Sequence, residues 1–180
     1  MTIAALASRA RVPRVHAMLV AALCVVAAES MVAQDPYTVV RIRSHSARIK
    51  GAIAEGTARS ATFRRLVEVI DAGDVLVYAD EGECKHEVPA CLLLSVTIAG
   101  SYRVLQIRVN LRKAPGCKLV ESIGHELHHV VEVLSERRIR TGSQLYHFFE
   151  GIGQTGLGRF ETAEALNVGL DVAREACRGR

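Results

Sequence analysis

The segment 117–134 reads CKLVESIGHELHHVVEVL, and it carries more information than any other part of the chain. Its apolar side chains recur at the spacing of one helical face, which predicts a helix buried along one side. They are Leu119, Ile123, Leu127, Val130 and Leu134. The same segment contains the pattern H-E-x-x-H. We therefore expect a long helix that packs against a core and also carries a pair of histidines.

The H-E-x-x-H pattern, His125-Glu126-Leu127-His128-His129, predicts a metal site with hydrolytic chemistry. Histidines four residues apart on a helix lie on one face, so His125 and His129 can bind one Zn²⁺ through two imidazole nitrogens. Glu126 then reaches a water at the metal and acts as its general base. His128 points away from the face that His125 and His129 share, so we expect it to be a bystander.

A catalytic zinc site needs a third protein ligand. Glu132 lies on the same face as the histidine pair, but a rise of about 1.5 Å per residue places it beyond a metal centred between them. We expect it to orient a histidine instead. The metzincin pattern, with a glycine turn and a third histidine, is absent. The remaining candidates are the downstream carboxylates Glu150, Glu161, Glu164 and Glu175.

Two segments resemble the gluzincin type of zinc metallopeptidase. They are IGHELHHVVE at 123–132 and FETAEA at 160–165, and in particular they resemble small exported bacterial proteins with a G-H-E-L-x-H helix and a later F-E/D-T-x-A segment. In gluzincins the third ligand is a glutamate on a later helix. The resemblance assigns that role to Glu161, with Glu164, one turn further on, as the alternative. The segment lacks the N-E-x-x-S-D form of the best-known gluzincins.

The resemblance also implies a zincin-like α+β fold and zinc-dependent hydrolysis of peptide bonds in a peptide or protein substrate. An edge strand near the motif helix would pair with the extended substrate, and the candidates are Tyr102–Asn110 and Cys91–Ala99. Tyr146 or His147 could stabilise the oxyanion. The alternatives are a non-catalytic exported zinc-binding scaffold and a structural domain whose motif is a coincidence.

The rest of the chain predicts a single α+β domain over residues 34–180. Helices are expected over 47–56, from Ser60 to about residue 72, from Ser143 through Phe149, and over 160–177 after a glycine-rich connection. Strands are expected at Val75–Ala79, Cys91–Ala99 and Tyr102–Asn110, and the last two should form a hairpin. This order predicts a small antiparallel or mixed sheet packed on the motif helix, with a helical C-terminal part.

Residues 1–33 have the layout of a secretory signal peptide. Arg9, Arg11 and Arg14 precede a short apolar run, Ala17–Ala28, and small residues follow it. An uncleaved anchor is the alternative. Removing this segment takes away three arginines and Glu29, so the net charge falls from +4 to +2. A nearly neutral chain without a basic stripe argues against a nucleic-acid partner. We expect a secreted or periplasmic protein with no stable membrane insertion after cleavage.

Four cysteines remain after residue 33, an even number that suggests disulfides in an exported chain. They are Cys84, Cys91, Cys117 and Cys177. We favour Cys84–Cys91, which closes a short loop, and Cys117–Cys177, which joins the start of the motif helix to the end of the chain. Free buried thiols are the alternative. The oligomeric state stays open.

Overall fold

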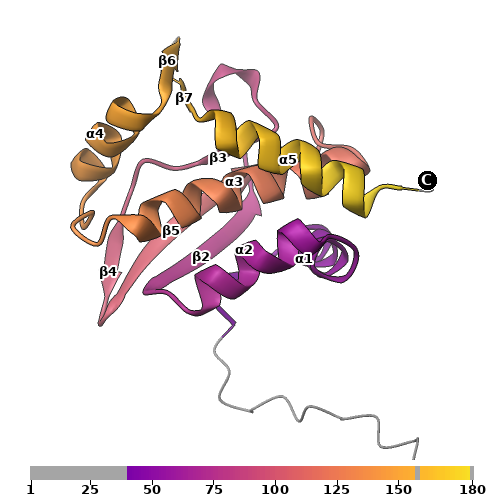
Figure 1. The fold of residues 1–180 in the computed structure, drawn as a ribbon, viewed down its shortest axis with the longest axis horizontal. Helices are drawn as coiled ribbons and strands as arrows, with labels where there is room; N and C mark the ends of the chain where they lie inside the picture. The colour runs from indigo at the N-terminus through magenta and orange to yellow at the C-terminus, as the bar shows by residue number, and fades with distance from the viewer. Residues whose placement is uncertain (1–39, 157–158, 179–180) are drawn as a thin grey trace, which may run out of the picture. The chain divides into compact units, whose positions relative to one another are not determined.

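The computed structural model describes residues 40–156 and 159–178, and the expected signal peptide lies outside them. In this part the strands are β1 Ile42–Arg43, β2 Val75–Glu81, β3 Ala90–Leu92, β4 Thr97–Ala99, β5 Tyr102–Val109, β6 Gln154–Gly156 and β7 Arg159–Glu161. The helices are α1 Ala47–Arg59, α2 Ala61–Asp71, α3 Cys117–Ser135, α4 Gly142–Ile152 and α5 Ala163–Ala176. This content confirms an α+β architecture (Figure 1).

The main sheet is mixed, with the strand order β1-β2-β5-β3 and with β4 also pairing with β5. Strands β1, β2 and β5 are parallel, whereas β3 and β4 run antiparallel to β5. The expected hairpin therefore forms, but the segment Cys91–Ala99 is split into two short strands. Because β5 is paired on both sides, β3 and β4 form one border of the sheet, and β3 contacts α3.

One face of the sheet is buried under the helices, as the alternation of its residues predicts. In β5, Leu105, Ile107 and Val109 are buried and Gln106 and Arg108 are exposed. Helix α3 contacts β2, β3 and β5 on one side and α5 on the other. The motif helix is thus the centre of the domain, between the sheet and the last helix.

Arg103 of β5 is a buried charge that the sequence analysis missed. It lies on the same face as the apolar residues of β5 and has no solvent exposure. Its Nε and Nη2 atoms donate to the carboxylate of Asp74 at 3.2 and 2.7 Å. Its Nη1 atom donates to the carbonyls of Val133 and Glu136 at 3.1 and 2.9 Å. Arg103 therefore caps the C-terminal end of α3 and fixes it to the sheet.

Side-chain caps set most helix starts. Ser46 caps α1, and Ser60 caps α2 at the expected start of that helix. Helix α1 does not end at Gly56 as expected, because it continues to Arg59 and uses Gly56 to lie against the Phe63 ring. Helix α4 begins after Thr141 rather than at Ser143, since Thr141 and Gln144 form a reciprocal capping box.

The C-terminal part differs from the expected pattern in a way that matters for the site. The glycine-rich connection includes two paired strands, β6 and β7, with Gln154 opposite Glu161 in the register. Helix α5 begins only after Thr162, whose hydroxyl accepts from the Ala165 N–H. The expected helix over 160–177 is therefore too long at its start, and Glu161 ends a strand instead of opening a helix.

Both favoured disulfides, Cys84–Cys91 and Cys117–Cys177, are confirmed, and each has a Cα–Cα distance of 6.0 Å. Disulfides are typical of proteins that fold outside the cytoplasm, which agrees with the expected export.

Within residues 40–156 and 159–178, none of the helices is both long enough and apolar enough to cross a membrane.

Candidate metal centre

Helix α3 places His125 and His129 one turn apart on the side that faces α5 and β7. Their ring centroids are 4.9 Å apart. Two glycines allow α5 to approach this face closely. A Cβ atom on Gly124 would meet Val172 at 2.9 Å, and one on Gly169 would meet the Cβ of His125 at 3.3 Å. The small residues therefore let the body of α5 pack closely against α3 beside His125.

Glu161 is the third member of the group. Its Oε2 atom lies 3.2 Å from Nε2 of His125. His125, His129 and Glu161 each offer one ligand atom, and these three atoms lie within 4.8 Å of one another. The structure thus brings together the three predicted ligands. Glu164, the alternative, lies one turn into α5 and is exposed. Because Glu161 ends β7, the expected position of this ligand on a helix is wrong.

The donor set fits a transition-metal ion. Two imidazoles and a carboxylate form the ligand set of several catalytic zinc sites. Ligand atoms about 2.1 Å from one ion, at tetrahedral angles, lie about 3.4 Å apart. The separation of 3.2 Å between His125 and Glu161 is close to that value. Burial lowers the pKa of His125, but Glu161 and Glu126 outweigh this effect, so the pKa is raised. The two carboxylates therefore favour a positive charge at this position.

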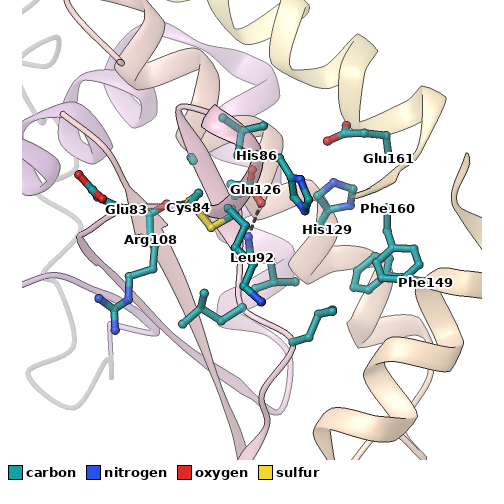
Figure 2. A pocket seen from close by; sticks show the side chains of 16 residues that line it. Glu83, Cys84, His86, Leu92, Arg108, Glu126, His129, Phe149, Phe160 and Glu161 are labelled. Atoms are coloured by element: carbon teal, nitrogen blue, oxygen red, sulfur yellow. Dashed lines mark hydrogen bonds between the residues drawn. A yellow bond between two sulfur atoms is a disulfide. The ribbon is translucent and has the colours of Figure 1, made fainter. Parts of the chain in front are cut away.

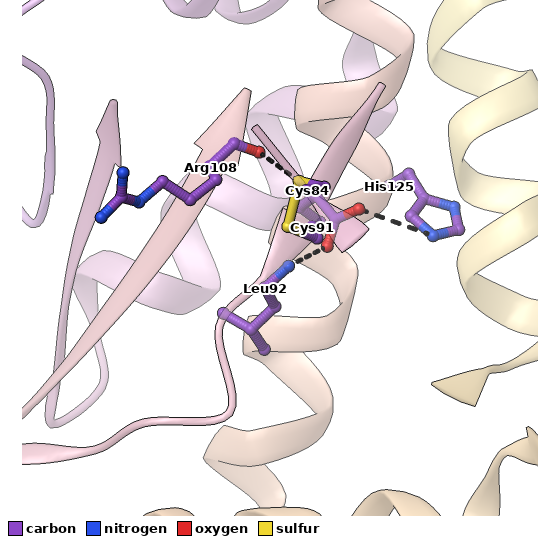
Figure 3. The surroundings of a disulfide bond; sticks show 6 residues. Cys84, Cys91, Leu92, Arg108 and His125 are labelled. Carbon is purple, nitrogen blue, oxygen red and sulfur yellow. Dashed lines mark hydrogen bonds and ion pairs between the residues drawn. A yellow bond between two sulfur atoms is a disulfide. The ribbon is translucent and has the colours of Figure 1, made fainter. Parts of the chain in front are cut away.

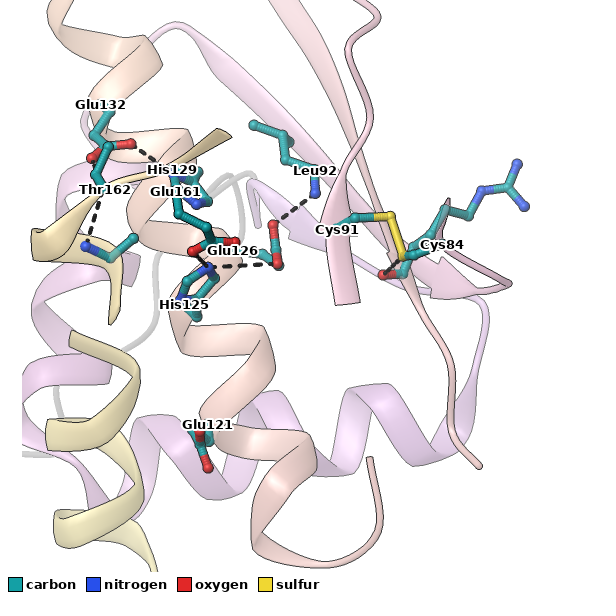
Figure 4. Close-up of polar contacts among 12 residues, drawn as sticks. Cys84, Cys91, Leu92, Glu121, His125, Glu126, His129, Glu132, Glu161 and Thr162 are labelled. Atoms are coloured by element: carbon teal, nitrogen blue, oxygen red, sulfur yellow. Dashed lines mark hydrogen bonds and ion pairs between the residues drawn. A yellow bond between two sulfur atoms is a disulfide. The ribbon is translucent and has the colours of Figure 1, made fainter. Parts of the chain in front are cut away.

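Glu132 orients His129, as the sequence predicts. Its Oε2 atom accepts from Nδ1 of His129 at 2.7 Å, and its Oε1 atom accepts from the Thr162 hydroxyl at 2.6 Å (Figure 4). Burial raises the pKa of Glu132, but these two hydrogen bonds and the nearby histidines lower it below its usual value. With Nδ1 protonated against this carboxylate, Nε2 of His129 has its lone pair available for a metal.

His128 is near this network but outside the candidate ligand group. Its Nε2 atom is 3.6 Å from Oε1 of Glu132. Burial lowers the pKa of His128, and this effect exceeds the opposing influence of Glu132. The arrangement agrees with the expected role of His128 as a neighbour of the site and not a ligand.

Glu126 lies next to the ligand group, and only 5% of its surface is exposed. Its Oε2 atom accepts from the main-chain N–H of Leu92 in β3 at 2.7 Å. Its Oε1 atom is 4.0 Å from Nε2 of His125. Burial raises the pKa of Glu126, and the charges of His129 and His125 and the Leu92 N–H oppose this effect only in part. One carboxylate oxygen is therefore anchored, and the other faces the ligand atoms.

A cavity of about 570 Å³ opens at this site (Figure 2). Glu126, His129 and Glu161 line it on one side, together with the aromatic rings of Phe149 and Phe160. The opposite wall comes from the disulfide-closed loop and the strand after it. Its residues are Glu83, Cys84, Lys85, His86, Val88, Ala90, Cys91, Leu92, Leu93 and Leu94. The cavity is large enough for part of a peptide chain.

The two expected oxyanion donors are not among the residues that line this cavity. The Tyr146 ring packs edge-on against Phe160 at 5.1 Å, and His147 bonds to Glu150 at 3.1 Å. His86, which the sequence analysis did not single out, does line the cavity, and its ring points toward that of His129 in Figure 2. The closed loop between Cys84 and Cys91 was the signal that could have drawn attention to it.

Comparisons of the chain with protein-family models, curated proteins and solved structures find no match. The fold and the group of His125, His129 and Glu161, which could hold a metal ion, are therefore the observations on which a function rests.

Proposed function

We propose that this protein is a zinc-dependent peptidase of the gluzincin type, with a zincin-like fold. The observation that carries the proposal is the position of Glu126. Its Oε1 atom lies 4.0 Å from the ligand nitrogen of His125, at the edge of a group in which three ligand side chains converge. At that distance, a water beside the line that joins these two atoms could occupy a place at the ligand group and still donate to Glu126. If Glu126 were far from the ligand group, the site would have a metal but no general base, and it would support metal binding without hydrolysis.

The chemistry follows from the residues that surround this water. His125, His129 and Glu161 would hold the ion. Bound zinc lowers the pKa of a water molecule toward about 7 and polarises the carbonyl under attack. Glu126 accepts a proton from the attacking water at Oε1. As the new C–O bond forms and the C–N bond breaks, Glu126 returns this proton to the leaving amine. The buried position of Glu126 keeps competing water away from it.

Strand β3 is suited to bind the substrate backbone. The N–H of Leu93 donates to Gln106, and the N–H of Asn110 donates to Pro89, so these alternate residues of the β3 segment face β5. Ala90 and Leu92 therefore direct their main-chain groups away from β5, toward the cavity, where the Leu92 N–H is already used by Glu126 and the Ala90 N–H and the two carbonyls remain for a substrate strand. An extended peptide could pair there, beside the ligand group. The segment Tyr102–Asn110 is a poorer candidate, because β5 already has partners on both sides.

The test begins with metal content. The protein covering residues 34–180, purified without a chelator, should contain about one zinc per chain. It should cleave members of a broad peptide library, and Glu126→Gln should keep the zinc and lose cleavage by about 100-fold or more. Glu121→Gln is the matched control, since Glu121 lies on the same helix and pairs with Lys118. Absence of zinc binding overturns the proposal. Zinc binding with no cleavage by any variant favours the scaffold alternative.

A further inference from the structure

The Leu92 N–H is an unusual donor for the side chain of a general base. It belongs to the main chain of β3 and faces away from β5, so no sheet hydrogen bond uses it. It instead donates to Oε2 of Glu126 at 2.7 Å, across 34 residues of sequence. This short bond ends on a buried carboxylate, where a charge-assisted hydrogen bond is strong. The border of the sheet and the motif helix are therefore joined at one atom of Glu126.

The two oxygens of Glu126 consequently have different surroundings. Oε2 is held by Leu92, while Oε1 faces Nε2 of His125 at 4.0 Å (Figure 4). A carboxylate can rotate about its last bond, and the Leu92 N–H removes that freedom. With the anchor in place, the same oxygen always faces the ligand group.

The position of Leu92 depends in turn on the Cys84–Cys91 disulfide. Strand β3 pairs with β5 over only Ala90–Leu92, which is a short ladder. Cys91 is the residue before Leu92, and its disulfide partner Cys84 lies with its sulfur 3.5 Å from the carbonyl oxygen of Arg108 in β5. The disulfide thus links Cys84, beside Arg108 of β5, to Cys91 in the middle of β3, the residue next to the donor (Figure 3).

We propose that the Leu92 main-chain N–H is a positioning group for Glu126, and that the Cys84–Cys91 disulfide holds it in place. The catalytic consequence rests on the proposed function, whereas the contact itself does not. Loss of the donor should leave the three metal ligands in place, because the hydrogen bond that is removed ends on Glu126 and not on a ligand. It should therefore lower kcat without changing zinc content.

Amide hydrogen exchange tests the contact without any activity measurement. In metal-free protein the Leu92 amide should be protected, although it lies on a sheet border. Glu126→Ala should speed its exchange about tenfold or more. The Leu93 amide is the internal control, since it donates to Gln106 within the ladder and should keep its protection in the variant. Equal Leu92 exchange in the two proteins, with Leu93 still protected, overturns the proposal.

The disulfide is tested by the same readout. In the Cys84→Ser/Cys91→Ser double variant, exchange at Leu92 should accelerate while amides in α3 stay protected. If exchange at Leu92 does not change in this variant, the role assigned to the disulfide is wrong. Fast amide exchange in α3 would show that the double variant has failed to fold. In that case the disulfide of folded wild-type protein is reduced instead, and faster exchange at Leu92 with α3 still protected supports the role of the disulfide.

The positioning role is tested by Leu92→Pro against Leu92→Ala. Proline removes the N–H at a position where the ladder does not use it, and alanine keeps the N–H. Leu92→Pro should have a kcat about 10- to 100-fold lower than that of Leu92→Ala, with the same zinc content in both variants. Equal kcat values in both variants overturn the positioning role. A zinc-loaded wild type that cleaves nothing overturns the proposed function, and the exchange experiment still decides whether Leu92 anchors Glu126.

Discussion

Replacing Glu132 with glutamine should weaken metal binding although Glu132 is not a ligand. Glu132 fixes His129 through a 2.7 Å bond to Nδ1, and it is itself fixed by the 2.6 Å bond from Thr162. Glutamine has the same shape but lacks the charge. It can also turn its amide NH₂ toward His129, in which case the imidazole would protonate at Nε2 and lose the lone pair that a metal needs.

The magnitude follows from this geometry. Loss of a partner that orients a metal-bound histidine typically lowers metal affinity 10- to 100-fold. This corresponds to about 1.4–2.7 kcal/mol of binding free energy. The upper part of the range is expected here, since Glu132 is 13% exposed and its bond to His129 is little weakened by solvent.

Competition with a chromophoric zinc chelator measures this effect. Apparent zinc dissociation constants of wild type, Glu132→Gln and Glu121→Gln should be compared at one pH. Glu121→Gln removes a carboxylate from the same helix and should bind zinc like the wild type. An unchanged affinity in Glu132→Gln, with folding intact, would refute the assignment of Glu132 as the residue that sets the tautomer of His129.

Two further predictions concern stability. Arg103→Met should lower the free energy of unfolding by about 3–5 kcal/mol in urea titrations, because it leaves Asp74 and the carbonyls at the end of α3 without their donor. Arg138→Met, at a side chain that is 93% exposed, is the control and should change the free energy of unfolding by less than about 0.5 kcal/mol. Similar losses of stability in the two variants would contradict the role of Arg103 as a cap of α3. Glu175 accepts from the Ser60 hydroxyl and the Thr62 N–H at the start of α2, and the Ser60 bond, opposed by burial, lowers its pKa in the fold. Its stabilising effect should be complete above about pH 5 and should disappear as pH falls through the lowered pKa, so the stability difference between wild type and Glu175→Gln should vanish in acid. A difference that grows on acidification would show the sign to be wrong.

The motif helix and the relative places of its side chains could be predicted from sequence because they depend on one helical period. The same geometry put His125 and His129 on one face, set His128 aside and made Glu132 a supporting residue. The two disulfides were also predictable, since four cysteines allow only three pairings.

The surroundings of Glu161 were predicted less well. The segment 160–177 has helical character, and nothing in its periodicity separates a strand residue from the first turn of the helix. Thr162 was the available signal, because a threonine before an alanine-rich run is a good N-cap. The pairing of β6 with β7 depends on residues brought together only in the folded chain.

Two important groups had no sequence signature. The Leu92 N–H is a main-chain donor, so no residue type announces it. Arg103 occupies one of the buried positions in the alternation of β5, but an arginine at such a position is normally read as an exception to the pattern. Its burial becomes favourable only when Asp74 and the end of α3 supply acceptors, and both are distant in sequence.

The Cys117–Cys177 disulfide encloses the whole candidate centre in one covalent loop. Its two cysteines are 60 residues apart, and His125, Glu126, His129 and Glu161 all lie between them. When the oxidised chain unfolds, these side chains remain on a closed ring, so the chain entropy that opposes their reunion is smaller by about 4 kcal/mol than in an open chain. The centre should therefore reassemble after denaturation faster, and at lower metal concentration, in oxidised than in reduced protein.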